Sequence, residues 1–510
     1  MSRVWAQSNS WSTLRWPVFP PTTPMATKTS IDSHARRPDG AGQLPEDAVS
    51  VTQETPQHSD PPRRARWPLV ASFASSGVVQ ALGILTGLLL ARILGPQGRG
   101  ELAAVLLWPL LLATVGGLGV HEATTYHVAR ATAALGTLVG SSLVIAFAQS
   151  VLLIAVGVAI VPLVLSHYDA DTVRSAHLFL ACIPLNLIAL SLMAVVNGRQ
   201  RFYWFQALRL SVIIFMAVGL LGFALADALT VRTAVIAYLA ANGVTTVAAG
   251  AVVFSAEAMQ LRFSLALSQQ LLWFGLRSHL SNVSLLLNER LDQLVISVFL
   301  VPAKLGLYVI AVTMTSLTSL VGSSVAVVVL PVVARLQPGP GRNAAVRNLV
   351  RLTLAGSVAI TIPLLLLAPV LIDLFFGEAF HGAADVSRVL LVAAVILSTN
   401  RTLGAVLKGI GRPFDAGIAE AMALGTTLVG LAALLPAFGL MGAGIVSLLA
   451  YAVGGAWMIR QAARALEMPV FALLLPDREE LGRLARLIWA QRAWPKTLAR
   501  TAADDRKSLD

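Results

Sequence analysis

Apolar runs of about 20 residues or more recur along the chain from residue 68 onward, with short connections between them. A run of this length can cross the hydrocarbon core of a bilayer as a helix, because a helix satisfies its backbone hydrogen bonds internally. Hydrophobic residues make up 56% of the 510 residues and charged residues only 13%. We therefore predict an all-α polytopic membrane protein with about 12 transmembrane helices, near residues 68–91, 101–120, 137–165, 174–196, 207–226, 231–254, 270–300, 304–333, 346–375, 384–408, 413–436 and 440–462.

Lys and Arg concentrate on one side of these spans. With the N-terminus inside, the cytoplasmic connections contain the basic stretches 63–66 and 342–351, whereas the outer connections contain fewer cations, such as Arg92 and Arg99. Cytoplasmic loops of membrane proteins carry this excess. We predict a multi-pass membrane protein with both termini in the cytoplasm. Its net charge of +12 then reflects cytoplasmic loops and anionic lipids rather than nucleic acid.

The chain ends differ from the spans in composition. Residues 1–66 are rich in Ser, Thr, Pro and charge, which predicts a disordered cytoplasmic tail. Residues 467–510 form a basic tail, in which "LGRLARLIWAQRAW" at 481–494 is typical of an amphipathic helix in the membrane interface, or else of a solvated tail with chance periodicity. The predicted domains between them are an N-lobe over 67–256, a cytoplasmic linker over 257–269 and a C-lobe over 270–466.

An internal repeat relates the two halves of the chain. Pro96 and Gly100 follow the first predicted span, and Pro302 and Gly306 follow the seventh, 206 residues further on. "AVVNG" at 194–198 and "AVLKG" at 405–409 lie at a similar offset. Because six spans return the chain to its starting side, the repeat is parallel. It predicts two six-helix lobes around a central cavity, the arrangement in which transporters bind substrate between the halves.

Motifs for several enzyme classes are missing from the sequence. It contains no G-x-x-x-x-G-K-[ST] loop for ATP phosphates and no H-E-x-x-H zinc motif. Cys182 is the single cysteine, so neither an internal disulfide nor a cysteine metal cluster can form. We therefore expect no catalytic residue, metal ligand or cofactor.

The segment "NERLDQLVIS" at 288–297 places five polar side chains within six positions of an apolar run. On a helical projection the polar residues of the seventh span share one arc, with leucines opposite, which is typical of a helix that faces a water-filled cavity. The alternative is a structural cluster of mutually neutralising charges, and for Arg401 a side chain that reaches the membrane interface. The candidate substrate-binding residues are Arg277, Asn282, Asn288, Glu289, Arg290, Asp292, Arg401 and Lys408.

Four segments, together spanning roughly residues 68–466, resemble one family. "RLDQLVISVFLVPAKLGLYVIAV" at 290–312 is similar to an Arg-x-Asp, loop, Gly-x-Tyr signature. "LLLARILGPQGRGELA" at 88–103, "FFGEAFHGAADVSRVL" at 375–390 and "AVLKGIGRP" at 405–413 are similar to further signatures. They resemble the polysaccharide-transport (oligosaccharide flippase) family of the multidrug/oligosaccharidyl-lipid/polysaccharide exporter superfamily. The opening tail is not part of the family pattern.

This resemblance implies a transporter rather than an enzyme. It implies an inner-membrane flippase that moves oligosaccharide linked to undecaprenyl diphosphate by alternating access, with cationic cavity residues at the phosphates. The expected partners are the lipid-linked oligosaccharide and membrane lipids, with polysaccharide polymerase and glycosyltransferases as further candidates. In the empty cavity, Asp292 and Glu289 are expected to orient the arginines and neutralise their charge.

Other functions fit the same sequence. A cation-coupled multidrug exporter and a flippase for the peptidoglycan lipid precursor share the superfamily and the expected fold. A membrane glycosyltransferase or ligase would need catalytic groups in a long outer loop, which the short connections do not provide.

Topology is testable with reporter fusions. A fusion after residue 466 is expected to report the cytoplasm, and a fusion within residues 376–383 the opposite side, because an odd number of predicted spans separates them. Activity on the same side from both fusions would contradict the topology.

Overall fold

In a computed structural model, the chain divides into two units, Met1–Asp60 and Pro61–Asp510. The structure describes residues 63–255 and 259–474, with side chains described outside 63–76 and 280–286. Most of the predicted N-terminal tail and the whole interfacial segment 481–494 lie outside the described residues. Residues 63–66, which we assigned to the tail, are already helical, since a run of Arg and Ala favours a helix.

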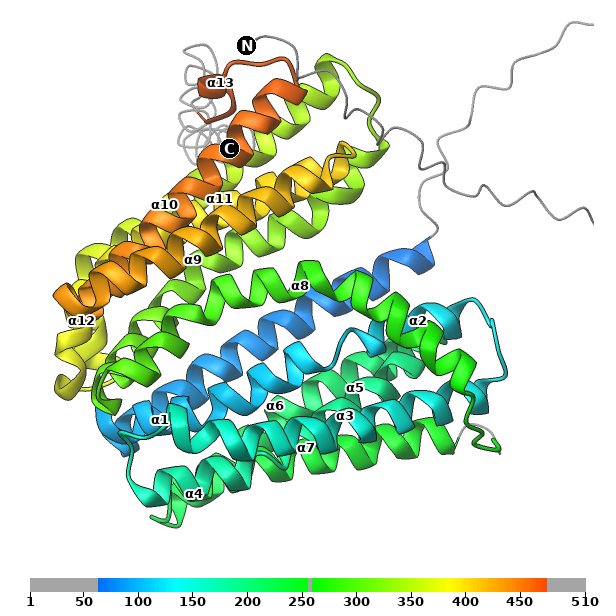
Figure 1. Cartoon of the computed structure of the whole chain (residues 1–510). Coiled ribbons are helices and arrows are strands. Elements are labelled where there is room, and N and C mark those ends of the chain that lie inside the picture. Colours follow the sequence, from blue (N-terminus) through cyan, green and yellow to red (C-terminus); the bar gives the residue numbers. More distant parts are fainter. Residues whose placement is uncertain (1–62, 256–258, 475–510) are drawn as a thin grey trace, which may run out of the picture. The chain divides into compact units, whose positions relative to one another are not determined.

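The described part of the second unit consists of helices joined by short connections (Figure 1). The first half contains α1 (Arg63–Gly116), α2 (Val120–Ala129), α3 (Leu135–Val164), α4 (Ala170–Phe179), α5 (Cys182–Gly198), α6 (Phe202–Leu225) and α7 (Val231–Phe254). The second half contains α8 (Leu265–Phe299), α9 (Pro302–Arg335), α10 (Pro340–Phe375), the 3-10 helix η1 (Glu378–Ala383), α11 (Ala384–Gly409), α12 (Pro413–Ala465) and α13 (Val470–Leu474).

The helices account for every predicted span. Within the described part, nine helical segments are long and apolar enough to cross a membrane. Two of these contain two predicted spans each, because α1 bends at Gly95 and α12 at Gly439, where φ is 63° and 54°. The seventh span corresponds to α8, which is long enough to cross the membrane but carries the polar segment. The predicted fold class, an all-α polytopic membrane protein, is confirmed.

Packing divides the helices into an N-terminal and a C-terminal set. Helices α2 to α7 pack on one another and on α1, and α9, α10, α11 and α12 pack on one another. Helix α8 contacts both sets, since it packs against α2 and α3 as well as α9 and α12. In its first half the His279 ring (Nε2) hydrogen-bonds the Thr114 carbonyl at 2.8 Å. The residue limits of the two lobes, 67–256 and 270–466, stay a prediction.

The two sets meet at the repeated Pro–Gly motifs. A Cβ added at Gly100 would lie 1.8 Å from the Pro302 carbonyl oxygen, and one added at Gly306 would lie 2.0 Å from the Pro96 carbonyl oxygen. The contact is therefore reciprocal. Gly100 of the first repeat lies against Pro302 of the second, and Gly306 of the second lies against Pro96 of the first. Only glycine allows the backbones of α1 and α9 to approach this closely.

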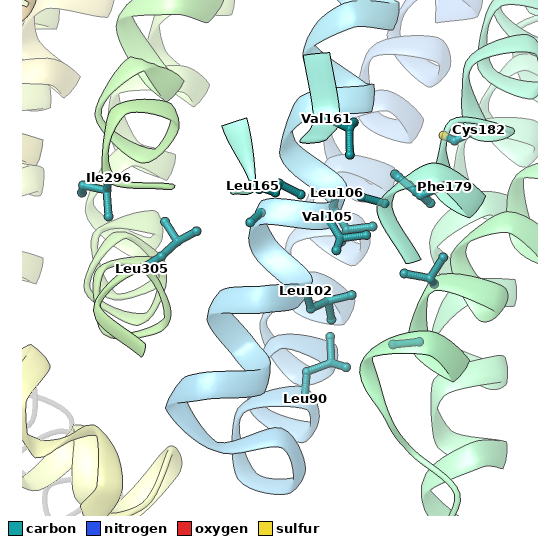
Figure 2. Close-up of a cluster of buried hydrophobic side chains, with 14 of the residues drawn as sticks. Leu90, Leu102, Val105, Leu106, Val161, Leu165, Phe179, Cys182, Ile296 and Leu305 are labelled. Carbon is teal, nitrogen blue, oxygen red and sulfur yellow. The ribbon is translucent and has the colours of Figure 1, made fainter. Parts of the chain in front are cut away.

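Apolar side chains surround this contact. Figure 2 shows one buried cluster that includes Leu90 and Leu102 of α1, Phe179 of α4, Ile296 of α8 and Leu305 of α9. Nearby, Arg92 of α1 donates from Nε to the Phe375 carbonyl at 2.7 Å and so satisfies an unpaired carbonyl at the end of α10. The two halves of the chain therefore share one core at this end of the helices.

Substitution of the contact glycine provides a stability test. Gly306→Ala is expected to lower the free energy of unfolding by about 1–3 kcal/mol, because the new methyl group overlaps the Pro96 backbone. The control is Gly83→Ala in α1, where an added Cβ has no atom within 4 Å. Thermal unfolding in detergent measures both variants. Equal melting temperatures would show that the close approach does not contribute to stability.

Candidate functional site: a polar cavity between α8, α9, α11 and α12

A cavity of about 290 Å³ lies beside the second half of α8. Its charged lining comes from Glu289, Arg290 and Asp292 of α8 and from Arg401 of α11. Tyr451 of α12 and Gln80 of α1 also contribute. Four of the eight predicted site residues therefore line one cavity, although Glu289 and Arg401 are 112 positions apart in the sequence.

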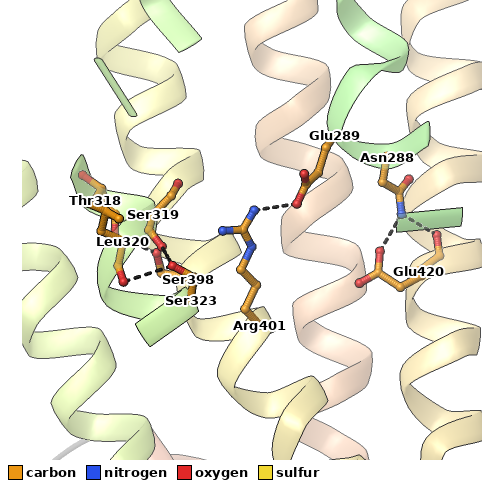
Figure 3. Close-up of polar contacts among 9 residues, drawn as sticks. All are labelled: Asn288, Glu289, Thr318, Ser319, Leu320, Ser323, Ser398, Arg401 and Glu420. Atoms are coloured by element: carbon orange, nitrogen blue, oxygen red, sulfur yellow. Dashed lines mark hydrogen bonds and ion pairs between the residues drawn. The ribbon is translucent and has the colours of Figure 1, made fainter. Parts of the chain in front are cut away.

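The strongest polar contact across the cavity is an ion pair. Arg401 donates from Nη2 to Glu289 Oε1 at 2.5 Å, and the side chains are 27% and 32% exposed (Figure 3). Arg290 is exposed and donates from Nη1 to Gln293 Oε1 at 3.3 Å. The cavity thus offers two guanidinium groups, one held by a carboxylate and one held by an amide.

A smaller cavity of about 20 Å³ adjoins the first, and both contain Glu289, Arg401 and Tyr451 in their walls. Asn288, a predicted site residue, lines the smaller one together with Glu420 of α12. Asn288 donates from Nδ2 to the Glu420 side chain at 2.6 Å and to its backbone carbonyl at 2.9 Å (Figure 3). This contact ties α8 to α12 next to the ion pair.

Asp292 accepts hydrogen bonds from α9 and from its own helix. Tyr308 of α9 donates its hydroxyl hydrogen to Asp292 Oδ2 at 2.5 Å, and the Gln293 backbone N–H donates to Oδ1 at 2.7 Å. Asp292 and Tyr308 are both buried. The Tyr308 contact joins α8 to α9, and the expectation that Asp292 orients an arginine stays a prediction.

This contact accounts for one of the family signatures, the segment at 290–312. In the Arg-x-Asp, loop, Gly-x-Tyr pattern, Asp292 pairs with Tyr308, and Gly306 makes the close approach to Pro96. Arg290 is the signature residue that remains exposed to the cavity. The signature therefore contains two contacts between helices, made by Asp292 and Gly306, and one cation at the cavity, Arg290.

Helix α9 contributes hydroxyl groups to the cavity lining. Thr315, Ser316, Ser319 and Ser323 of α9 line the cavity at helical spacings of one to four residues. Ser323 and Thr315 donate to carbonyls of the preceding turn, so their oxygens can still accept hydrogen bonds. The cavity therefore combines a charged lining of two arginines and two carboxylates with a row of hydroxyl groups on α9.

The remaining predicted residues lie elsewhere or are not described. Arg277 stacks on Trp273, with its guanidinium carbon 4.4 Å from the ring centroid, and does not line either cavity. Lys408 is exposed and is absent from both linings. The side chain of Asn282 lies outside the described residues. The polar residues of the seventh span therefore lie in two different surroundings. Those in the first half of α8 lie near α2, and those in the second half line the cavity.

Several lining residues were not predicted. Glu420 and Asp415 are the two carboxylates of the apolar run 413–436, and the position of Glu420 further inside that run was the signal available. The hydroxyl groups of α9 were visible as Ser and Thr at helical spacing in residues 315–323. Nothing in the sequence distinguished Tyr451 or Gln80. No group of three or more His, Cys, Asp or Glu side chains in the described helices is arranged to hold a metal ion.

Comparison with known proteins identifies the family. Residues 89–385, more than half of the chain, match the family described as "Polysaccharide biosynthesis protein". The chain belongs to this family. The match includes Glu289, Arg290 and Asp292 and ends before Arg401. No curated protein matches the chain.

Solved structures share the fold. One is described as the lipid II flippase MurJ in an inward closed conformation, with a TM-score of 0.64 at 14% identity, covering 80% of this chain and 89% of that one. Another is an inward-facing multidrug resistance MATE family transporter of the MOP superfamily, with a TM-score of 0.59 at 18% identity, covering 76% and 96%. A third, the MATE multidrug transporter DinF-BH, has a TM-score of 0.54 at 13% identity, covering 80% and 97%. These similarities show that the chain shares the fold of these membrane transporters, and with the nine candidate spans of the described part they support a multi-pass membrane protein.

The Asp292 contact can be tested by removing one hydroxyl group. Tyr308→Phe is expected to lower the free energy of unfolding by about 1–3 kcal/mol, because it leaves a buried carboxylate without its main donor. Tyr451→Phe is the matched control, since the Tyr451 hydroxyl has no hydrogen-bond partner within the described part of the chain. Thermal unfolding compares the two. A larger loss in Tyr451→Phe would contradict the structural role of Tyr308.

Proposed function

We propose that this protein is a flippase that moves oligosaccharide linked to undecaprenyl diphosphate across the inner membrane by alternating access. The observation that carries the proposal is the cavity in which Arg290 and Arg401 lie together. Charged side chains at membrane depth are rare and mark substrate pathways. The family match to polysaccharide biosynthesis proteins supports a saccharide substrate.

The cavity chemistry suits the head of such a lipid. A diphosphate needs fixed positive charge where water is scarce, and a guanidinium group can donate two parallel hydrogen bonds to one phosphate. Arg290 and Arg401 supply that charge. The hydroxyl groups of α9 line the same cavity and offer acceptors and donors to sugar hydroxyls next to the diphosphate.

Alternating access requires contacts between the two halves to separate. Under the predicted topology the contact between Gly100 and Gly306 lies towards the outer side, so the present arrangement closes that side. In the proposed cycle the head group enters from the cytoplasm, and separation of α1 from α9 opens the route outward. The two lobes, the cytoplasmic tails and an association with polymerase or glycosyltransferases are part of the same proposal.

Two related functions share this fold. A multidrug exporter would bind an organic cation, which the carboxylates of Glu289 and Glu420 could attract. A flippase for the peptidoglycan precursor would bind the same diphosphate with a different saccharide. Binding assays with anionic lipids and cationic dyes separate the first of these from the proposal, and the saccharide preference separates the second.

Transport measurements on two arginines of the same helix test the proposal. Arg401→Ala is expected to reduce export about 10- to 100-fold, because it removes a charge-assisted contact to the phosphate. Arg388→Ala is the control, since Arg388 pairs with Asp385 on the same turn of α11 and does not line the cavity. Translocation of a fluorescent polyprenyl-diphosphate saccharide in proteoliposomes measures both. Equal translocation rates for Arg401→Ala and Arg388→Ala at equal protein abundance would contradict the proposal.

A further inference from the structure

The ion pair between Glu289 and Arg401 joins two helices inside the cavity. Other ion pairs, such as those of Arg174 with Asp171 and Arg388 with Asp385, join residues three positions apart on one helix and are well exposed. Glu289 and Arg401 come from α8 and α11, and both line the larger and the smaller cavity. Their contact therefore occupies the part of the wall that a ligand would reach.

The Glu289 carboxylate and a phosphate offer Arg401 the same type of hydrogen-bond acceptor. A carboxylate and a phosphate both offer pairs of anionic oxygens to the N–H groups of a guanidinium. Arg401 Nη2 already donates to Glu289 Oε1 at 2.5 Å. A phosphate that takes the Nη2 hydrogen now directed at Glu289 Oε1 must therefore displace the carboxylate.

The surroundings make this displacement reversible. The two side chains are 27% and 32% exposed, so water can reach both charges, and separating them costs less than separating a fully buried ion pair. Glu289 also shares the smaller cavity with the Glu420 carboxylate, which Asn288 holds in place at 2.6 Å. A Glu289 carboxylate freed from Arg401 would face a like charge nearby, and this repulsion favours its return.

We propose that Glu289 is an internal competitor for the anionic head of the substrate. Glu289 binds Arg401 in the empty cavity and is displaced from it by the incoming phosphate. After translocation Glu289 binds Arg401 again and displaces the phosphate. A carrier needs a site that binds strongly enough to load and weakly enough to unload. Glu289 sets that balance for the substrate class in the proposed function, on which this inference rests.

Binding of farnesyl diphosphate to purified protein in nanodiscs tests this role, with farnesol as the uncharged comparison. Glu289→Gln keeps the size of the side chain and removes the competing charge. It is expected to bind farnesyl diphosphate about 2- to 5-fold more tightly than wild type, in proportion to the strength of a partly exposed ion pair, and to release it more slowly. Arg401→Ala is expected to lose affinity.

Asp385→Asn is the matched control, because it removes a carboxylate from an ion pair of α11 outside the cavity. Its affinity is expected to equal that of wild type. Glu289→Asp, which keeps the charge on a shorter side chain, is expected to bind with an affinity between those of wild type and Glu289→Gln. The affinity of Glu289→Asp also tests the role of Glu289 if the glutamine variant does not fold.

The outcomes separate the two proposals. Unchanged or weaker binding by a folded Glu289→Gln variant, with wild type binding and Arg401→Ala not binding, overturns the role of Glu289 and leaves the proposed function standing. Failure of wild type to prefer farnesyl diphosphate over farnesol overturns both. Tighter binding by Glu289→Gln with unchanged binding by Asp385→Asn supports the competitor role.

Discussion

The close approach of two glycine backbones, Gly100 of α1 and Gly306 of α9, constrains the rest of the structure. A methyl group at either position would overlap a carbonyl of the other helix. The contact brings the first and second halves of the chain together at equivalent positions of the repeat. It also fixes where α8 runs, since α9 begins soon after α8 ends and carries both Gly306 and Tyr308.

Helix α8 is held between the two halves by polar contacts of different kinds. Its first half hydrogen-bonds the N-terminal helices through His279, and its second half is tied to α9 through Asp292 and to α12 through Asn288. These contacts satisfy His279 Nε2, Asn288 Nδ2 and the Asp292 carboxylate, which would otherwise be costly to bury in an apolar surrounding. Arg290 and Arg401 are then left facing the cavity, and this is the feature from which we infer an anionic ligand.

Much of this arrangement could be predicted from the sequence. The lengths of apolar runs predicted every span, because bilayer thickness fixes how many residues a helix needs. The repeat of Pro96 and Gly100 at Pro302 and Gly306 predicted two related halves, and the polar residues of 288–297 predicted a cavity on one face of the seventh span. Placing Arg401 with Glu289 and Arg290 in one candidate site was also possible, since few charged residues occur inside apolar runs.

Other features depend on contacts between distant segments. In the sequence, Asp292 and Arg290 are two charged residues of one motif, and nothing there separates their roles. Only the position of Tyr308 in the structure shows that Asp292 makes a hydrogen bond between α8 and α9. Arg277 shares the helical face of Glu289, yet α8 contacts different helices along its length, so a projection could not separate their roles. The lobe limits, the orientation of the termini and the substrate roles of individual residues stay predictions.

Solvent access along α8 tests the central claim, that its second half faces a hydrated site for an anionic lipid head. In a Cys182→Ser background, Glu289→Cys and Arg290→Cys should react with a water-soluble maleimide, whereas Leu294→Cys and Ile296→Cys, at buried positions, should not. Farnesyl diphosphate should protect the reactive pair, and farnesol should not. Equal reactivity at all four positions, or equal protection by both compounds, would contradict the account.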